Sequence, residues 1–139
     1  MRPSPGDEIP DHEVLYRFCR PEAFPPGQME IPCGLFADRS LSCDWKKMRG
    51  DPSTSRHVAE GKTRVIWITV CDEIRNPRNP KRDGQLVPEW RQAITYAPTT
   101  DADDPGHAAN DAHSLVTGLK KQPVRQALAA NSTWTDVRR

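Results

Sequence analysis

The sequence predicts an α+β fold, in which a small, mainly antiparallel sheet carries two short helices and long proline-rich loops. Its strand-like segments are short and separated by turn residues, as is typical of such sheets. The 139 residues include 14 prolines, which interrupt every long helix and exclude helical bundles and coiled coils. The 35% of hydrophobic residues suffices for one modest core and not for two.

We expect a disordered segment over residues 1–13, one domain over 14–131 and a C-terminal tail over 132–139. The first eleven residues hold three prolines and mixed charges, a composition that buries little apolar surface. Residues 14–18 then alternate β-branched and aromatic side chains and predict the first strand. A second strand is predicted at 41–45, where apolar and polar residues alternate.

Residues 63–70 form the clearest strand, because β-branched residues and Trp67 occupy most of its positions. We expect it to be a central strand of the sheet. Further strands are predicted at 92–96 and 114–117. The predicted core contains four residues from these strands: Leu15, Trp67, Ile94 and Val116.

Two short helices complete the fold. Asp51 and Pro52 are typical of a helix start, and Gly61 ends the short helical stretch that follows them. Pro123 suits the first position of a second helix over 123–130, whose apolar residues lie on one stripe. Between these elements, the proline-rich stretches 20–28, 76–84 and 98–112 predict loops.

The charges nearly cancel, with 20 basic and 19 acidic residues, and this balance argues against nucleic acid as a partner. Locally the signs separate: residues 1–30 hold three basic and six acidic side chains, whereas 39–64 hold seven basic and three acidic ones. Such patches suit the docking of a charged partner, although they also occur on ordinary solvated surfaces. The basic loop 75–82 near Trp90 could contact a single strand, or it could simply be solvated.

No apolar run reaches the roughly 20 residues of a membrane span, and the first residues lack the pattern of a signal peptide. We therefore expect no membrane contact, a cytoplasmic location and reduced thiols. The four cysteines form no Cys-x-x-Cys pair, which favours packing roles for Cys19 and Cys71.

The loop over 101–113 gathers four aspartates and two histidines. His107, Asp111 and His113 are its candidate metal ligands, because carboxylate and imidazole groups bind divalent cations. Their spacing matches no zinc or calcium pattern, so we expect no bound metal and no cofactor. The alternative is a solvated acidic loop in which these side chains cap turns.

Arg17 is a second candidate, because strand alternation places it on the face opposite Tyr16 and Phe18. An arginine there could bind a carboxylate or phosphate in bidentate fashion, or could pair with a surface carboxylate. No Gly-x-Ser-x-Gly motif and no glycine-rich phosphate loop is present, which argues against the common hydrolases and nucleoside triphosphatases.

Three short motifs lie within residues 14–130: Leu15-Tyr16-Arg17, Leu41-Ser42-Cys43-Asp44-Trp45 and Asn110-Asp111-Ala112-His113. A basic, alanine-rich helix is predicted after Lys120. With them, the chain resembles a small group of uncharacterised bacterial proteins that share a Leu-x-Arg strand, a Leu-Ser-x-Asp segment and an Asn-x-Ala-His turn. The resemblance implies a shared fold and no particular activity. It directs attention to Arg17, Ser42, Asp44 and His113.

The layout also resembles the ADP-ribosyltransferase fold, in which a first strand supplies His or Arg near the nicotinamide ribose and a second strand supplies Ser or Thr. That resemblance implies catalytic roles for Arg17, for Ser40 or Ser42, and for His113. Such enzymes often use a glutamate on a late strand, whereas this chain has no glutamate after Glu89. His113 would then act as in the RNA 2′-phosphotransferase relatives, which lack that glutamate.

Two functions follow as hypotheses. The first is a non-enzymatic accessory subunit that acts with a larger protein partner, as in a bacterial defence or regulatory multi-gene system. The alternative is a nucleotide-processing enzyme of the ADP-ribosyltransferase or RNA 2′-phosphotransferase type, with Arg17, Ser42 and His113 as its catalytic residues. The oligomeric state stays open in both.

Overall fold

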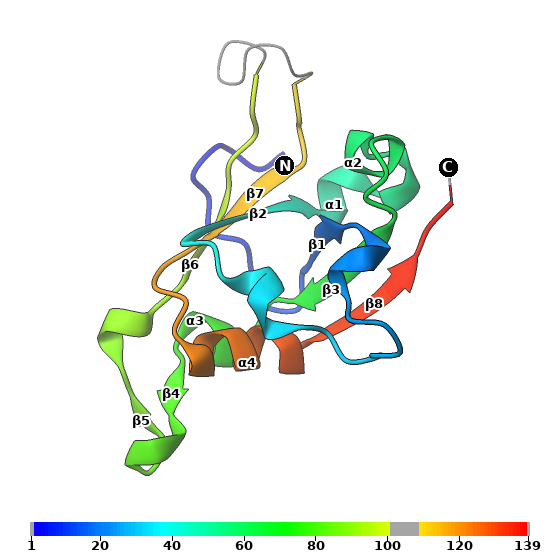
Figure 1. The fold of residues 1–139 in the computed structure, drawn as a ribbon. Coiled ribbons are helices and arrows are strands. Elements are labelled where there is room, and N and C mark those ends of the chain that lie inside the picture. The colour runs from blue at the N-terminus through cyan, green and yellow to red at the C-terminus, as the bar shows by residue number, and fades with distance from the viewer. Residues whose placement is uncertain (1, 101–108, 139) are drawn as a thin grey trace.

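A six-stranded antiparallel sheet forms the centre of the molecule, with its strands in the order β6-β7-β2-β1-β3-β8 (Figure 1). The computed structural model describes residues 2–100 and 109–138. The strands of the sheet are β1 (Val14–Cys19), β2 (Ser40–Trp45), β3 (Arg64–Thr69), β6 (Ala93–Tyr96), β7 (His113–Thr117) and β8 (Ser132–Asp136). The predicted α+β class with a mainly antiparallel sheet is confirmed.

Within the described residues, four short helices and five 3-10 turns connect these strands. The helices are α1 (Lys46–Arg49), α2 (Arg56–Ala59), α3 (Asp72–Arg75) and α4 (Gln122–Ala130). The 3-10 turns span Pro21–Ala23, Cys33–Phe36, Pro52–Thr54, Pro80–Arg82 and Pro88–Trp90. Four of these turns begin at a proline, because its fixed φ suits the first helical position and its missing N–H costs nothing there.

Each face of the sheet has its own apolar cluster, because successive side chains of a strand point to opposite faces. Leu15 of β1 lies in the main core, under α4, whereas Tyr16 and Phe18 lie in a second cluster beside Val58 of α2. The predicted core residues Leu15, Ile94 and Val116 are buried in the main core.

The prediction for Trp67 was wrong in one respect. Trp67 lies on the second face, where it is partly buried and packs edge-on against Tyr16 with ring centroids 4.9 Å apart. Its strand, β3, is an interior strand of the sheet, as predicted, because it pairs with β1 on one side and with β8 on the other.

The N-terminal segment is ordered where we expected disorder. Ile9 N donates to Ile94 O at 2.9 Å and Gly6 N to Tyr96 O at 2.7 Å, so residues 6–9 run along the outer edge of β6. Ile9 is completely buried in the main core. The composition of the segment misled the prediction, because the backbone groups of an unpaired strand edge can order a polar segment.

The expected C-terminal tail is likewise a strand over most of its length. β8 pairs with β3 from Ser132↔Ile68 to Asp136↔Arg64. Val137 N continues the pairing by donating to Thr63 O at 2.8 Å. The sheet therefore reaches almost to the end of the described chain.

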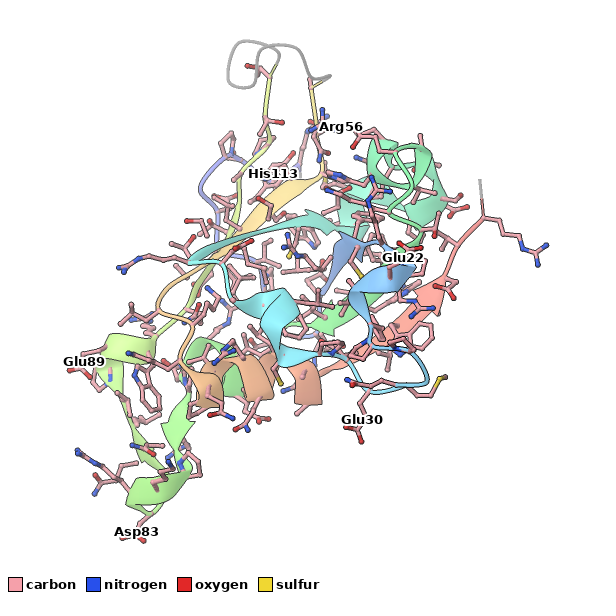
Figure 2. All side chains as sticks on the ribbon, viewed as in Figure 1. Glu22, Glu30, Arg56, Asp83, Glu89 and His113 are labelled. Carbon is pink, nitrogen blue, oxygen red and sulfur yellow. The ribbon has the colours of Figure 1, made fainter. Side chains whose placement is uncertain are left out.

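Residues 76–90 project from the body of the molecule as an arm (Figure 1). A two-stranded sheet of β4 (Arg78–Asn79) and β5 (Gln85–Leu86) runs along it. Asp83, which has φ 52°, lies at its tip (Figure 2). No helix within the described part of the chain has the length and apolar composition to span a bilayer.

Candidate functional site

Arg17, Ser42 and His113, the three residues of the enzyme hypothesis, line one small cavity of about 50 Å³. We call it the polar pocket. It lies at the junction of β1, β2 and β7, and Figure 2 shows His113 on β7. The described residues that line it are Arg17, Phe18, Ser42, Cys43, Asp44, His57, Lys62 and His113.

The polar pocket exists because β1 and β2 separate. The two strands pair at Leu15↔Trp45 and Tyr16↔Asp44, and no pairing follows beyond these residues. The guanidinium of Arg17 bridges the opening: Nη1 donates to Ser42 O at 3.1 Å and Nη2 to Asp38 Oδ2 at 3.2 Å. Two of its donors are thereby engaged within the chain.

Asp44, Arg49 and Asn110 form a closed hydrogen-bonded network beside the pocket. Asp44, which is almost fully buried, accepts from Arg49 Nε at 3.0 Å and from Asn110 Nδ2 at 2.8 Å. Arg49 Nη2 completes the network by donating to Asn110 Oδ1 at 2.8 Å. The network joins the end of β2 to α1 and to the start of β7, which gives Asp44 a structural role.

The two histidines of the pocket have different surroundings. His113 Nδ1 lies 2.7 Å from Ala97 O, so its ring is anchored to the end of β6. His57 stacks on Phe18 with ring centroids 5.3 Å apart, and burial lowers its pKa below the usual value. Its Nδ1 is buried and has no hydrogen-bond partner within the described residues.

Sequence reasoning did not identify His57, Lys62 or Arg49 as neighbours of the site. His57 was part of a predicted helix, and no local pattern links that helix to β7. Arg49 and Asn110 are 61 residues apart, a separation at which spacing rules carry no information. The available signal was the pair of motifs that contain Asp44 and Asn110, the Leu-Ser-x-Asp segment and the Asn-x-Ala-His turn, whose two residues are hydrogen-bonded in the structure.

Size limits what the polar pocket can do chemically. A cavity of about 50 Å³ has room for only a few water molecules. Pockets that bind nucleotide-sized ligands measure about 300–1,000 Å³. The three candidate residues are together, but the space between them does not accommodate a dinucleotide.

The candidate metal ligands are dispersed as far as the structure describes them. His107 lies outside the described residues. Asp111 pairs with Arg2, and His113 is held at Ala97. Among the residues that the structure describes, no group of three or more His, Cys, Asp or Glu side chains could hold a metal ion.

All four cysteines are free thiols. Cys19 is buried and Cys71 is half-buried. Burial raises the pKa of Cys43, which lines the polar pocket, to about 12. Cys43 is therefore protonated at neutral pH and is not a nucleophile, since the thiolate is the reactive form.

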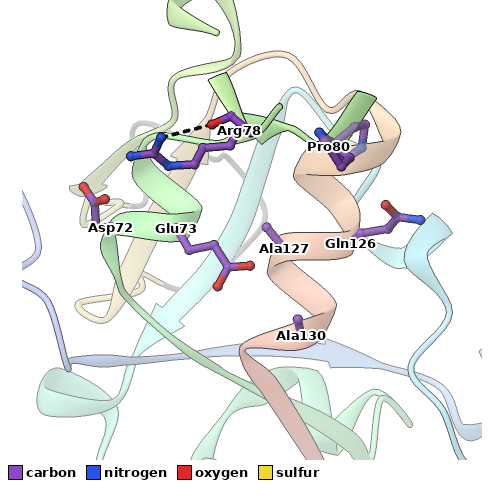
Figure 3. A pocket seen from close by; sticks show the side chains of 9 residues that line it. Asp72, Glu73, Arg78, Pro80, Gln126, Ala127 and Ala130 are labelled. Atoms are coloured by element: carbon purple, nitrogen blue, oxygen red, sulfur yellow. Dashed lines mark hydrogen bonds between the residues drawn. The ribbon is translucent and has the colours of Figure 1, made fainter. Parts of the chain in front are cut away.

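A larger cavity, of about 520 Å³, lies between α3, α4 and the arm. We call it the α4 groove. Figure 3 shows Asp72 and Glu73 of α3 on one side, Ala127 and Ala130 of α4 on the other, and Arg78 of the arm beside them. The Asp72 carboxylate accepts from Asn76 Nδ2 at 2.8 Å and the Glu73 carboxylate from Asn131 Nδ2 at 3.2 Å.

A second open cavity, of about 450 Å³, lies on the other side of α4. We call it the β8 groove. Its lining is Met29, Glu30, Ile31, Cys33, Gln126, Ala129, Ala130, Ser132, Thr133 and Trp134. Gln126 and Ala130 line both grooves, so one exposed edge of α4 stands between two concavities.

Comparison of the chain with protein-family models, with curated proteins and with solved structures gave no match.

Proposed function

We propose that the chain is a non-enzymatic accessory subunit that binds a larger protein partner across α4. The observation that supports this function is the pair of open grooves, of about 520 and 450 Å³, on either side of Gln126 and Ala130. Each has the size of a pocket that receives a ligand or a side-chain cluster of a partner. The exposed small side chain of Ala130 leaves room for the partner to approach the helix closely.

Charge specifies the partner's chemistry at the α4 groove. Asp72 and Glu73 of α3 line the cavity, and amide donors hold their carboxylates in place. Figure 3 shows the Glu73 carboxylate directed toward α4, where it is exposed and would pair with a lysine or arginine of the partner. Arg78, Lys81 and Arg82 on the arm would in turn favour an acidic patch beside that cation.

The enzyme alternative has less support. It requires a nucleotide between Arg17, Ser42 and His113, and the cavity that they line measures only about 50 Å³. Two donors of Arg17 are bound to Ser42 O and Asp38, so they are not directed toward a phosphate. The described surface therefore gives more support to partner binding than to catalysis.

Two arginine substitutions on α4 test the proposal. Ala130→Arg places a long cation at the edge that both grooves share, whereas Gln122→Arg adds the same charge to the same helix, at an exposed position that lines neither groove. A photo-crosslinking amino acid in place of Gln126, introduced in the cells that make the protein, gives a covalent adduct from which the partner is identified and purified.

We expect Ala130→Arg to weaken binding of that purified partner by tenfold or more, which corresponds to about 1.4 kcal/mol. Gln122→Arg should bind like the unaltered chain, and both variants should keep the thermal stability of the parent. Equal affinity of the two variants would contradict the proposal. So would a crosslinker at Ser40, on the other face of the sheet, that captures the same partner as efficiently as one at Gln126.

A further inference from the structure

The two edges of the six-stranded sheet differ. At the β6 edge the chain covers itself: residues 6–9 bond to Ile94 and Tyr96, and Ile9 enters the main core. At the β8 edge, β8 pairs with β3 on its inner side, and no described residue bonds to its outer side in the same manner. An uncovered edge is a template for one more strand.

The register shows which backbone groups face outward. Thr69 N donates to Asn131 O and Val137 N to Thr63 O, so residues 131, 133, 135 and 137 direct their N–H and C=O groups toward β3. Hydrogen-bonded and non-hydrogen-bonded pairs alternate in an antiparallel ladder. Ser132, Trp134 and Asp136 therefore direct their backbone groups away from the sheet, toward an added strand.

The β8 groove lies next to this edge, on the face of the sheet that carries the main core. Ser132 and Trp134 line the groove and pair with Ile68 and Ile66 of the main core. Residues that pair across strands share a face. An added strand would therefore direct alternate side chains into the groove, as the segment at the β6 edge directs Ile9 into the core.

The lining of the groove specifies those side chains. Ile31, Ala129 and Trp134 give it apolar walls. The indole of Trp134 is fixed, because Nε1 donates to Met29 O at 2.8 Å and Arg64 Cζ lies 4.1 Å from the ring centroid. The wall is therefore already in place before a ligand arrives.

Glu30 supplies the charge. It is exposed, and it is the one charged side chain among the described residues that line the groove. Figure 2 shows Glu30 close to the end of α4, on the side where β8 begins. A carboxylate beside an apolar cavity, with no cation in its lining, complements a ligand that has a basic side chain next to an apolar one.

We propose that the β8 edge receives an extended segment of the protein partner as a seventh strand, with an apolar side chain in the β8 groove and a lysine or arginine beside Glu30. The inference rests on the proposed partner-binding function and specifies how the partner is held. Main-chain hydrogen bonds to Trp134 and Asp136 supply affinity, and the groove with Glu30 supplies specificity.

A matched pair of substitutions at Asp136 isolates the backbone contribution. Asp136→Ala and Asp136→Pro both remove the ion pair with Arg64. Only the proline removes the outward N–H, and a proline is tolerated where that N–H faces away from the sheet. The probe is a synthetic peptide of alternating β-branched residues with isoleucine two positions from lysine, and its control is the same peptide N-methylated at alternate residues.

With the peptide at about 1 mM, we expect the amides of Trp134 and Asp136 to become protected from hydrogen exchange, and the N-methylated control to leave them unprotected. Asp136→Pro should weaken binding of the peptide at least tenfold relative to Asp136→Ala. Glu30→Gln should weaken the lysine peptide and leave an isosteric norleucine peptide unaffected. Unchanged exchange at Trp134, or equal affinity of the two Asp136 variants, would overturn the proposal.

Three other outcomes are distinguishable. If the chain itself forms dimers that Asp136→Pro abolishes, the edge binds a second copy and the proposed occupant is wrong. If Ala130→Arg prevents binding of the purified partner and Asp136→Pro does not, partner binding over α4 stands and strand addition fails. If neither substitution affects that partner, the proposed function fails as well.

Discussion

Asp44 is the residue on which the local structure around the polar pocket depends most. It is 1% exposed, and both of its carboxylate oxygens accept hydrogen bonds, one from Arg49 and one from Asn110. Asp44→Asn would replace an acceptor with an amide and leave the guanidinium of Arg49 without its counter-charge. Loss of one member of a buried pair typically costs about 3–5 kcal/mol.

We therefore expect Asp44→Asn to lower the free energy of unfolding by an amount near the lower end of that range, about 3 kcal/mol, because Arg49 is partly exposed. Urea denaturation measures this change in the free energy of unfolding. The matched control is Asp38→Asn, which removes the exposed partner of Arg17 and should cost about 0–1 kcal/mol. Equal losses in the two variants would show that the Asp44 network is not a main support of the fold.

His57 should make stability depend on pH. Burial lowers its pKa in the folded state below the ordinary 6.5, so the unfolded chain takes up a proton first as the pH falls. The free energy of unfolding then decreases as the pH drops through that ordinary value, whereas above it His57 contributes no such change. His57→Gln removes this source of acid sensitivity.

The comparison requires urea denaturation of both proteins at about pH 7.5 and about pH 5. We expect the unaltered chain to lose more stability between the two conditions than His57→Gln does. Parallel losses would mean that His57 does not resist protonation in the folded state.

At the level of single residues, the candidate site was partly predictable. Alternation correctly placed Arg17 on the face opposite Tyr16 and Phe18, because a strand's period of two follows from local backbone geometry. The size of the polar pocket was not predictable. It depends on where β1 and β2 stop pairing, and that is set by contacts with the rest of the sheet.

Among the elements, the segment over residues 6–9 has the most testable role. Ile9 is completely buried, and Arg75 binds Glu8 of the same segment at 2.8 Å and the nearby Asp11 at 3.0 Å. Ile9→Ala would leave a cavity between the segment and the core. Such substitutions cost about 2–5 kcal/mol.

We expect Ile9→Ala to lower the free energy of unfolding by about 3 kcal/mol, again measured with urea. Met29→Ala is the control, since Met29 is 72% exposed and its truncation should change stability by no more than about 0.5 kcal/mol. A negligible effect of Ile9→Ala would mean that residues 6–9 do not hold the edge of β6 in solution.

Most strands of the six-stranded sheet and α4 were predicted well, whereas α1, α3, the two strands of the arm and the terminal elements were not predicted. β1, β2, β6 and α4 carry their own periodicity, and each begins and ends close to the predicted residues. Residues 6–9 and β8 lack a strong apolar pattern of their own. They are ordered by the exposed edges of β6 and β3, which exist only after the sheet has formed.

At the scale of the whole molecule, ligand binding separates the two functional hypotheses. A dinucleotide held at 100 times its dissociation constant stabilises a protein by about 2.7 kcal/mol. The cavity lined by Arg17, Ser42 and His113 measures about 50 Å³, so we expect neither a nicotinamide dinucleotide nor ADP-ribose to raise the melting temperature in a thermal-shift assay. A rise that Arg17→Met abolishes would revive the enzyme hypothesis.

Local sequence patterns were enough to predict the α+β class, most strands of the sheet and the main helix, because each depends on spacing within a few residues of chain. The strand order, the covering of one sheet edge and not the other, the size of the polar pocket and the two grooves beside α4 depend on how the whole chain packs. These features arise where residues distant in the chain meet, as Asp44 meets Asn110 and Ile9 meets β6. Local periodicity does not encode such long-range contacts, so they can be identified only in the folded structure.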